Sequence, residues 1–231
     1  MHASASKPLQ RRTPADPKSR TEGEPGIRIE ALTPDRLDDL AGLFDQPGDP
    51  KWCWCASFHI TGNVKARPRE DNREVLTART VEGPSPGLLG YRDGRVVAWV
   101  SVGPRASYRK LANRDYADAA APGAAAAPTV AGAASDPDQE RVWSIVCFVV
   151  DPRERRRGVA RAMLAAAVEH ARAAGATAVE AYAIDPLGER IPNPIAYGGM
   201  RSMFEAAGFR VVGERLAGRT RWPRPVVRLD L

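Results

Sequence analysis

The 231-residue sequence contains no apolar run approaching the ~18 residues that a membrane-spanning helix needs. Residues 1–26 also lack the continuous apolar core of a secretory signal. Cysteine is scarce: there are three in the chain, and an odd count without a signal is typical of a reducing compartment. These absences argue against a membrane protein and against a disulfide-stapled secreted domain, so we expect a cytoplasmic protein.

Aromatic residues are also few, at 6% of the chain, and they are not interleaved with basic residues as in platforms that stack single-stranded nucleic acid. The net charge of +6 permits a nucleic-acid partner, but this arrangement does not favour one, and we expect none. The P-loop motif G-x-x-x-x-G-K-[ST] is absent, which argues against a nucleotide hydrolase of that kind.

Two segments have the composition of unfolded chain. Residues 1–26 are rich in Pro, Ser, Lys and Arg with almost no large apolar residues, so they cannot offset the entropy cost of ordering. Residues 117–139 consist mostly of small residues interrupted by proline. We predict a disordered tail at 1–26, a long mobile loop at about 117–139, and a single domain over 27–231.

Within that domain the apolar pattern predicts a mixed α/β fold with the element order β-α-α-β-β-β-α-β-α-β-β. Residues 142–150 are continuously apolar, which fits a strand buried on both faces. A hairpin at 88–102 should turn at Asp93-Gly94. The other strands are expected at 27–32, 177–184, 211–212 and 225–231, and the helices at 33–44, 69–80, 158–175 and 197–207.

The stretch 150-VDPRERRRGVARAM-163 places five arginines around one glycine, between the buried strand and an alanine-rich helix. Such a charge run is often only a solvated surface. Here, however, the first turn of a helix offers unpaired N–H groups and a positive dipole end, and glycine lets the backbone approach a ligand. We therefore predict a phosphate or pyrophosphate site, with Arg153 adding charge. Its residues are Arg155, Arg156, Arg157, Gly158, Val159, Ala160 and Arg161.

The run Val150-x-Pro152-x-x-Arg155-x-x-Gly158-x-Ala160 resembles the acetyl-CoA signature of the GNAT (Gcn5-related) N-acetyltransferases, V-x-P-x-x-[QR]-x-x-G-x-[GA]. The stretch 203-MFEAAGF-209 resembles the family's late helix, and the element order from 27 to 231 also matches. The WCWC segment and the long loop look like a poorly characterised bacterial subgroup. The resemblance implies a single α/β domain whose mixed, mostly antiparallel sheet splays between its two central strands and is flanked by helices.

The resemblance also implies a function. Acetyl-CoA would be the co-substrate, with no metal. Phe148, Val149 and Val150 would contact its pantetheine arm and Phe204 would pack beside it, while a backbone N–H near Val149 would polarise the thioester carbonyl. The expected acceptor is the primary amine of a small molecule, which attacks directly. Two alternatives stay open: an acyl-CoA-binding regulator or scaffold with little turnover, and a protein or peptide N-acetyltransferase. A homodimer is compatible with all three.

Two family positions depart from the pattern. The usual tyrosine acid is Phe204, which cannot donate a proton; Tyr197 is the candidate replacement, with packing against CoA as its alternative role. A glutamate base found in histone-acetylating relatives aligns with Ser144. Glu180 on the next strand, or Glu140 before the strand, could act through a water, and bulk water could also remove the proton.

The segment around Cys53, Cys55 and His59 invites a metal interpretation, but it supplies at most three ligands and has no second pair. Trp52 and Trp54 beside it favour a packed core or a pocket wall instead. We expect no metal site there.

Three further expectations concern single positions and one segment. Cys147 is expected to be a small core residue and His170 a surface residue. Residues 185–199, together with 52–55, are expected to wall the acceptor site.

Overall fold

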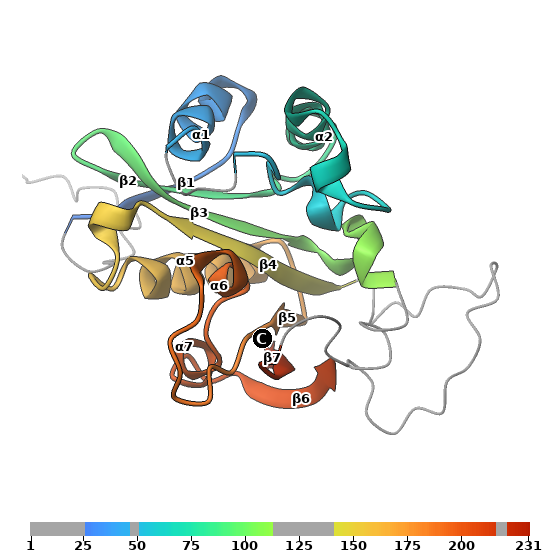
Figure 1. The fold of residues 1–231 in the computed structure, drawn as a ribbon, viewed down its shortest axis with the longest axis vertical. Helices are drawn as coiled ribbons and strands as arrows, with labels where there is room; N and C mark the ends of the chain where they lie inside the picture. The colour runs from blue at the N-terminus through green and yellow to red at the C-terminus, as the bar shows by residue number, and fades with distance from the viewer. Residues whose placement is uncertain (1–25, 47–50, 113–140, 216–220) are drawn as a thin grey trace, which may run out of the picture.

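The computed structural model describes residues 26–46, 51–112, 141–215 and 221–231 (Figure 1). The predicted mobile loop at 117–139, Glu140 and all but the last residue of the predicted tail lie outside these ranges. The helices are α1 (Leu37–Phe44), α2 (Arg69–Glu82), α5 (Val159–Ala173), α6 (Asn193–Ala196) and α7 (Arg201–Glu205). The strands are β1 (Arg28–Ala31), β2 (Gly87–Arg92), β3 (Arg95–Pro104), β4 (Val142–Val150), β5 (Ala178–Tyr182), β6 (Arg210–Arg215) and β7 (Arg224–Asp230).

The strands form a seven-stranded sheet in the order β1-β2-β3-β4-β5-β7-β6. Every neighbouring pair is antiparallel except β4 and β5, which run parallel. Those two strands pair only from Val142↔Ala178 to Ile145↔Ala181. Beyond this point β4 stays paired with β3 as far as Val150, while β5 ends at Tyr182. The predicted splay between the central strands is therefore confirmed.

A β-bulge marks the point of divergence. Ser101 faces Cys147 and Val102 faces Ile145, so Val146 has no partner on β3. An extra residue of this kind bends its strand and increases the local twist. As a result, Val146 and Cys147 both belong to clusters on the α1/α2 side of the sheet, whereas Ile145 and Phe148 pack on the α5 side.

The helices cover both faces of the sheet (Figure 1). On one face α5 buries the apolar residues that the helical spacing predicts, among them Met163, Leu164 and Ala167, against β2, β3 and β4. On the other face α1 and α2 cover a second cluster with Trp54 and Trp99 at its centre. The hairpin turn has positive φ at Asp93 and Gly94, as its sequence predicts. No helix in the described ranges is both long and apolar enough to cross a membrane.

Two expectations are wrong in detail. The late helix does not run from 197 to 207: residues 197 and 198 form a turn, Gly199 has φ +83°, and α7 begins only at Arg201. After this turn, Met200 forms an isolated β-bridge with Ile184, which lies just beyond the end of β5. His170 is not simply a surface residue: its ring is half-buried 5.5 Å from that of Trp143, and burial lowers its pKa.

Candidate active site

A pocket of about 380 Å³ lies where β4 ends, between the β4–α5 loop and α7. Most of the residues predicted to hold pyrophosphate line it, together with side chains from the region of α7. The lining residues are Val150, Glu154, Arg155, Arg156, Gly158, Val159, Ala160, Arg161, Met200, Ser202 and Met203.

Gly158 gives the loop its shape. It caps α5 in the left-handed conformation at φ +75°, which glycine adopts without steric cost. Its carbonyl accepts the N–H groups of Arg161 and Ala162. The N–H groups of Val159 and Ala160 lie in the first helical turn, where the helix itself offers no acceptor. The pocket thus combines guanidinium groups with backbone donors and the positive end of a 15-residue helix.

Two buried carboxylates hold this basic loop in place. Glu154 forms ion pairs with Arg92 on β2 and, at 3.4 Å, with Arg157. Asp151 accepts the backbone N–H of Arg153 at 2.9 Å. Arg157, which the sequence predicted to hold pyrophosphate, pairs with Glu154 but does not itself line the pocket. Glu154 is an acidic residue within a run of arginines, and this pattern could have indicated from the sequence that it pairs with one of them.

The gap between β4 and β5 lies next to this pocket. The backbone N–H of Phe148 points into the gap and donates to the carbonyl oxygen of Tyr197 at 2.7 Å. The N–H of Asp151 points the opposite way, to Val97 on β3. Since N–H directions alternate along a strand, the amides of Phe148 and Val150 face the gap and that of Val149 faces β3. The amide predicted near Val149 is therefore that of Phe148 or Val150, and its role stays a prediction.

The two predicted contacts from phenylalanine rings lie on the α5 side of the gap. Phe204 is fully buried, with its ring 6.1 Å from that of Phe148 and 5.2 Å from that of Phe209. Tyr197 lies on the other side, packed against the cluster under α1 and α2. Tyr197 and Phe148 therefore meet through their backbones at the gap.

Comparison with known proteins agrees with this geometry. Residues 51–189 match the model of the acetyltransferase (GNAT) family. The chain belongs to the GNAT family. No curated protein matches the chain.

Solved structures share the fold at low identity. A Gcn5-related N-acetyltransferase from Kribbella flavida has a TM-score of 0.53 at 16% identity, with 89% of this chain and 98% of that chain covered. A proposed acetyltransferase from Salmonella typhimurium, solved with its cofactor acetyl-CoA, has a TM-score of 0.51 at 14% identity, covering 89% and 94%. A ribosomal-protein-alanine N-acetyltransferase from Brucella melitensis has a TM-score of 0.51 at 17% identity, covering 88% and 99%.

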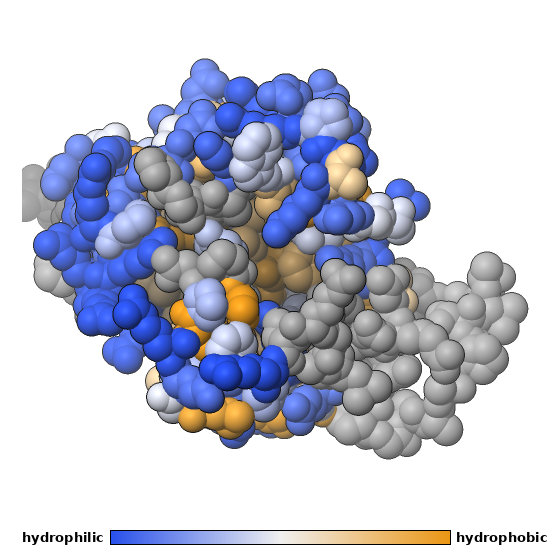
Figure 2. All heavy atoms as spheres, in the orientation of Figure 1, coloured by the Kyte–Doolittle hydropathy of each residue, from blue (hydrophilic) through white to orange (hydrophobic). Residues whose placement is uncertain are grey.

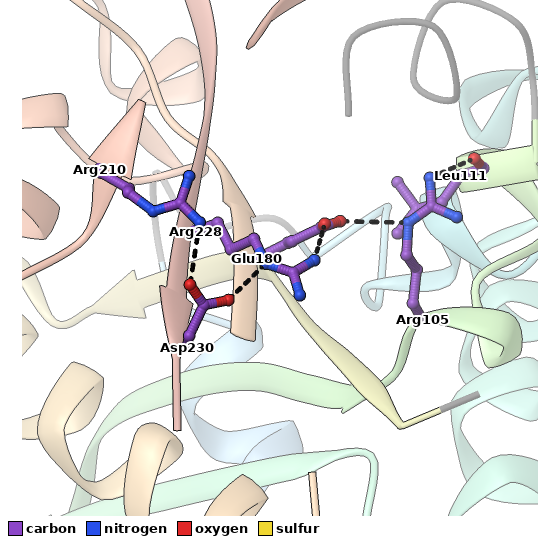
Figure 3. Close-up of polar contacts among 6 residues, drawn as sticks. All are labelled: Arg105, Leu111, Glu180, Arg210, Arg228 and Asp230. Atoms are coloured by element: carbon purple, nitrogen blue, oxygen red, sulfur yellow. Dashed lines mark hydrogen bonds and ion pairs between the residues drawn. The ribbon is translucent and has the colours of Figure 1, made fainter. Parts of the chain in front are cut away.

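The candidate base positions of this GNAT domain lie side by side. Ser144 on β4 and Glu180 on β5 are direct register partners, and both are buried. The Glu180 carboxylate forms ion pairs with Arg105 at 3.2 Å and Arg228 at 3.1 Å (Figure 3). Both oxygens are thus engaged by guanidinium groups, which makes Glu180 an anchor for two arginines. Its role as a base stays a prediction.

Tyr182, which the sequence reasoning did not single out, lies beside the gap. It follows the last β4–β5 pair on β5 and is buried on the α1/α2 side. Burial raises the pKa of its phenol to about 12, with Glu180 acting in the same direction and Arg105 and Ser144 opposing. The phenol is therefore protonated at neutral pH. The sequence offered one signal for Tyr182: residues two apart on a strand face the same side of the sheet, so Tyr182 must lie on the same side as Glu180.

The three cysteines and His59 also lie on this side. The indole N–H of Trp99 lies 3.1 Å from the Cys55 sulfur. A hydrogen bond with Cys55, together with burial, raises the pKa of the Cys147 thiol well above its usual value. A protonated thiol is a poor nucleophile, so Cys147 is best explained as a packing residue. In the described ranges, no group of three or more His, Cys, Asp or Glu side chains could hold a metal ion.

The space-filling view, in which α1 and α2 lie at the top, shows hydrophobic residues in a hollow near the centre, bordered by hydrophilic residues (Figure 2). On the α1/α2 side of the sheet, the partly buried Phe58, Cys147 and Val212 pack against a buried cluster that includes Tyr108 and Tyr182. We refer to these five residues as the Tyr108–Tyr182 cluster. Trp52, expected near this wall, is 60% exposed, while Trp54 is in the core.

Proposed function

We propose that this GNAT domain transfers an acetyl group from acetyl-CoA directly to the primary amine of a small molecule. The observation that carries the proposal is the pocket at Gly158. It combines the amides of a helix start with Arg155, Arg156 and Arg161, and it opens beside the gap between β4 and β5. A pyrophosphate fits the first feature and an extended pantetheine arm the second.

Residues at the gap would serve the reaction in stated ways. The amides of Phe148 and Val150 would pair with carbonyl oxygens of the arm, and the Phe148 amide would polarise the thioester carbonyl. The amine nitrogen forms a bond to the acetyl carbon, the carbon–sulfur bond breaks, and CoA leaves as thiolate. Tyr197 is the proposed proton donor to that sulfur. The proton lost by the amine would leave through Glu180 or through water.

Two observations favour a second candidate, an acyl-CoA-binding regulator with little turnover. The Phe148 amide already donates to the Tyr197 carbonyl, and the buried Phe204 cannot supply a proton. A domain that binds acetyl-CoA without efficient transfer would have these features. A protein or peptide N-acetyltransferase is the third candidate, and the similar Brucella melitensis protein is a ribosomal-protein-alanine N-acetyltransferase.

Two measurements on the full chain separate these candidates. Calorimetry with acetyl-CoA tests binding, and CoA release with a panel of small amines and peptides tests transfer. The proposed function predicts binding together with turnover of a small amine. Binding with only background hydrolysis would support the regulator, and turnover confined to peptides would support the third candidate. No binding would exclude all three.

A further inference from the structure

A row of alternating charges crosses the α1/α2 side of the sheet, from β6 to the end of β3 (Figure 3). Arg210 donates to Asp230 at 2.9 Å, and Asp230 also accepts the Nε–H of Arg228 at 2.7 Å. Arg228 then pairs with Glu180, and Glu180 with Arg105. The row therefore begins and ends with an arginine.

The two ends of this row differ in their surroundings. The Arg210 side chain is 64% exposed, so water screens its charge. The Arg105 side chain is only 19% exposed and shares the 4%-exposed Glu180 with Arg228. Arg105 also donates to the carbonyl oxygen of Leu111, which carries no charge. One buried carboxylate divided between two guanidinium groups leaves excess positive charge at the buried end.

A further cation increases this excess. Arg79 on α2 lies close enough to the Tyr108 and His59 side chains to influence the titration of both. Its Nε is buried and has no hydrogen-bond partner among the described residues, although the residue as a whole is only half-buried. Buried charge is costly unless it is paired. The Tyr108–Tyr182 cluster therefore has Arg79 near Tyr108 and Arg105 near Tyr182.

The distance between the Arg105–Glu180 pair and the gap determines how long a molecule must be to reach both. Glu180 is the register partner of Ser144, and Ser144 is four residues before Phe148 on β4. At about 3.3 Å per residue, and allowing for the bulge, the two points are on the order of 10 Å apart. A molecule that reaches from the Phe148 amide to Arg105 must therefore place several bonds between its two ends.

We propose that Arg105 and Arg228, held in place by Glu180, bind a carboxylate of the acceptor. The acceptor is then a small primary amine whose carboxylate lies several bonds from the nitrogen. Its intervening carbon chain would lie on the apolar surface of Phe58, Cys147 and Val212. Guanidinium groups suit this role because their N–H fork matches the two carboxylate oxygens. The inference rests on the proposed function, since it names the substrate class of the same site.

The test uses ω-amino acids of increasing chain length, each compared with its methylamide, which keeps the amine and removes the negative charge. Binding to the protein–CoA complex is measured by calorimetry, and kcat/KM by CoA release. We expect one intermediate chain length at which the acid binds at least about tenfold more tightly than the amide, the lower end for a charged hydrogen bond. Equal binding of acid and amide at every length would overturn the inference.

Variants test whether the preference for the acid depends on Arg105. Arg105→Gln should reduce the preference for the acid to near parity, while Arg172→Gln, an exposed ion-paired arginine on α5, should leave it unchanged. Arg105→Lys keeps the charge and should retain part of the preference, which covers the case in which Arg105→Gln does not fold. A folded Arg105→Gln protein with the full preference would contradict the inference.

The two proposals fail in different ways. If the acids bind better than the amides but no amine releases CoA, the anion subsite stands and the transferase function falls. If neutral amines are acetylated as well as the acids, the function stands and the carboxylate inference falls.

Discussion

Gly198 packs so closely on the carbonyl oxygen of Tyr182 that a β-carbon at position 198 would lie 2.6 Å from it. The contact brings the backbone of residues 197–199 into the gap beyond the last β4–β5 pair. On the β4 side Tyr197 accepts the Phe148 N–H, and on the β5 side Gly199 accepts the Ile184 N–H at 2.9 Å. The protein's own backbone therefore bridges the opening that a pantetheine arm would need.

This bridge predicts the effect of Gly198→Ala. The added methyl group must displace the 197–199 segment from Tyr182, which should lower the melting temperature. It should also free the Phe148 amide. Because a net hydrogen bond contributes about 1 kcal/mol, we expect acetyl-CoA to bind up to about fivefold more tightly. Calorimetry measures this, and weaker binding would mean that the segment supports the bound arm.

The pocket at Gly158 predicts a loss of binding when charge is reversed there. Gly158→Glu places bulk and a negative charge at the helix start, and we expect at least a tenfold loss of acetyl-CoA affinity, about 1.4 kcal/mol. Gly158→Ala is the matched control, since it introduces the same strain at positive φ without the charge. Unchanged affinity in a folded Gly158→Glu protein would remove the pyrophosphate assignment.

Tyr197→Phe tests the proposed proton donor. As an acid, Tyr197 should affect kcat and leave acetyl-CoA affinity almost unchanged; general acid help is typically about 10²–10⁴-fold, and a thiolate leaving group places the loss near or below the low end. As a packing residue it should affect affinity or stability instead. Tyr182→Phe is the informative comparison, because its phenol lies on the same side of the sheet. An unaltered kcat, with chemistry shown to be the slow step, excludes Tyr197.

His59 predicts a pH-dependent stability. Burial is the main reason that its pKa falls from the usual 6.5 to about 4, with Arg79 adding to the effect. Its Nδ1–H donates to the Ser107 carbonyl at 3.2 Å. The unfolded chain binds a proton below pH 6.5 and the folded chain only near pH 4, so stability falls as pH falls through this window. The full effect is roughly 3 kcal/mol.

Urea unfolding of wild type and His59→Gln between pH 5 and 7 measures this effect, since ordinary carboxylates titrate mostly below that range. We expect the wild type to lose stability toward pH 5 more steeply than the variant. His170→Gln is a useful control, because burial lowers the His170 pKa in the same direction but that ring is only half-buried. Parallel pH profiles for wild type and His59→Gln would contradict the assignment.

The sequence predicted those parts of the molecule whose structure depends on neighbours in the chain. The apolar run of β4, the helical spacing of α5 and the turn at Gly158 are local patterns, and each forms where it was expected. The late helix was predicted to begin at Tyr197, because the apolar spacing from Met200 to Ala207 does not show that the helix starts only after Gly198 and Gly199. The conformation of those glycines is decided by contacts with β5, which a local pattern does not contain.

The partners of Glu180 show the same limit more strongly. Arg105 and Arg228 are 75 and 48 residues away in the chain, and nothing near either arginine indicates a shared carboxylate. Likewise, Cys55 and Cys147 meet only because the β4 bulge places Cys147 on the α1/α2 side. Long-range register decides these contacts.

Because of the bulge at Val146, β4 should tolerate substitutions at this position better than the deletion of a residue. A strand without the extra residue would pair continuously with β3, and the side chains on one side of the deletion would exchange faces. Deleting Val146 should therefore turn Ser144 toward α5 or Phe148 toward α1 and α2, and should remove the bend that separates β4 from β5. Substitution of Val146 by another apolar residue leaves the number of residues in β4, and therefore the bulge, unchanged. At this position the number of residues matters more than the identity of the residue.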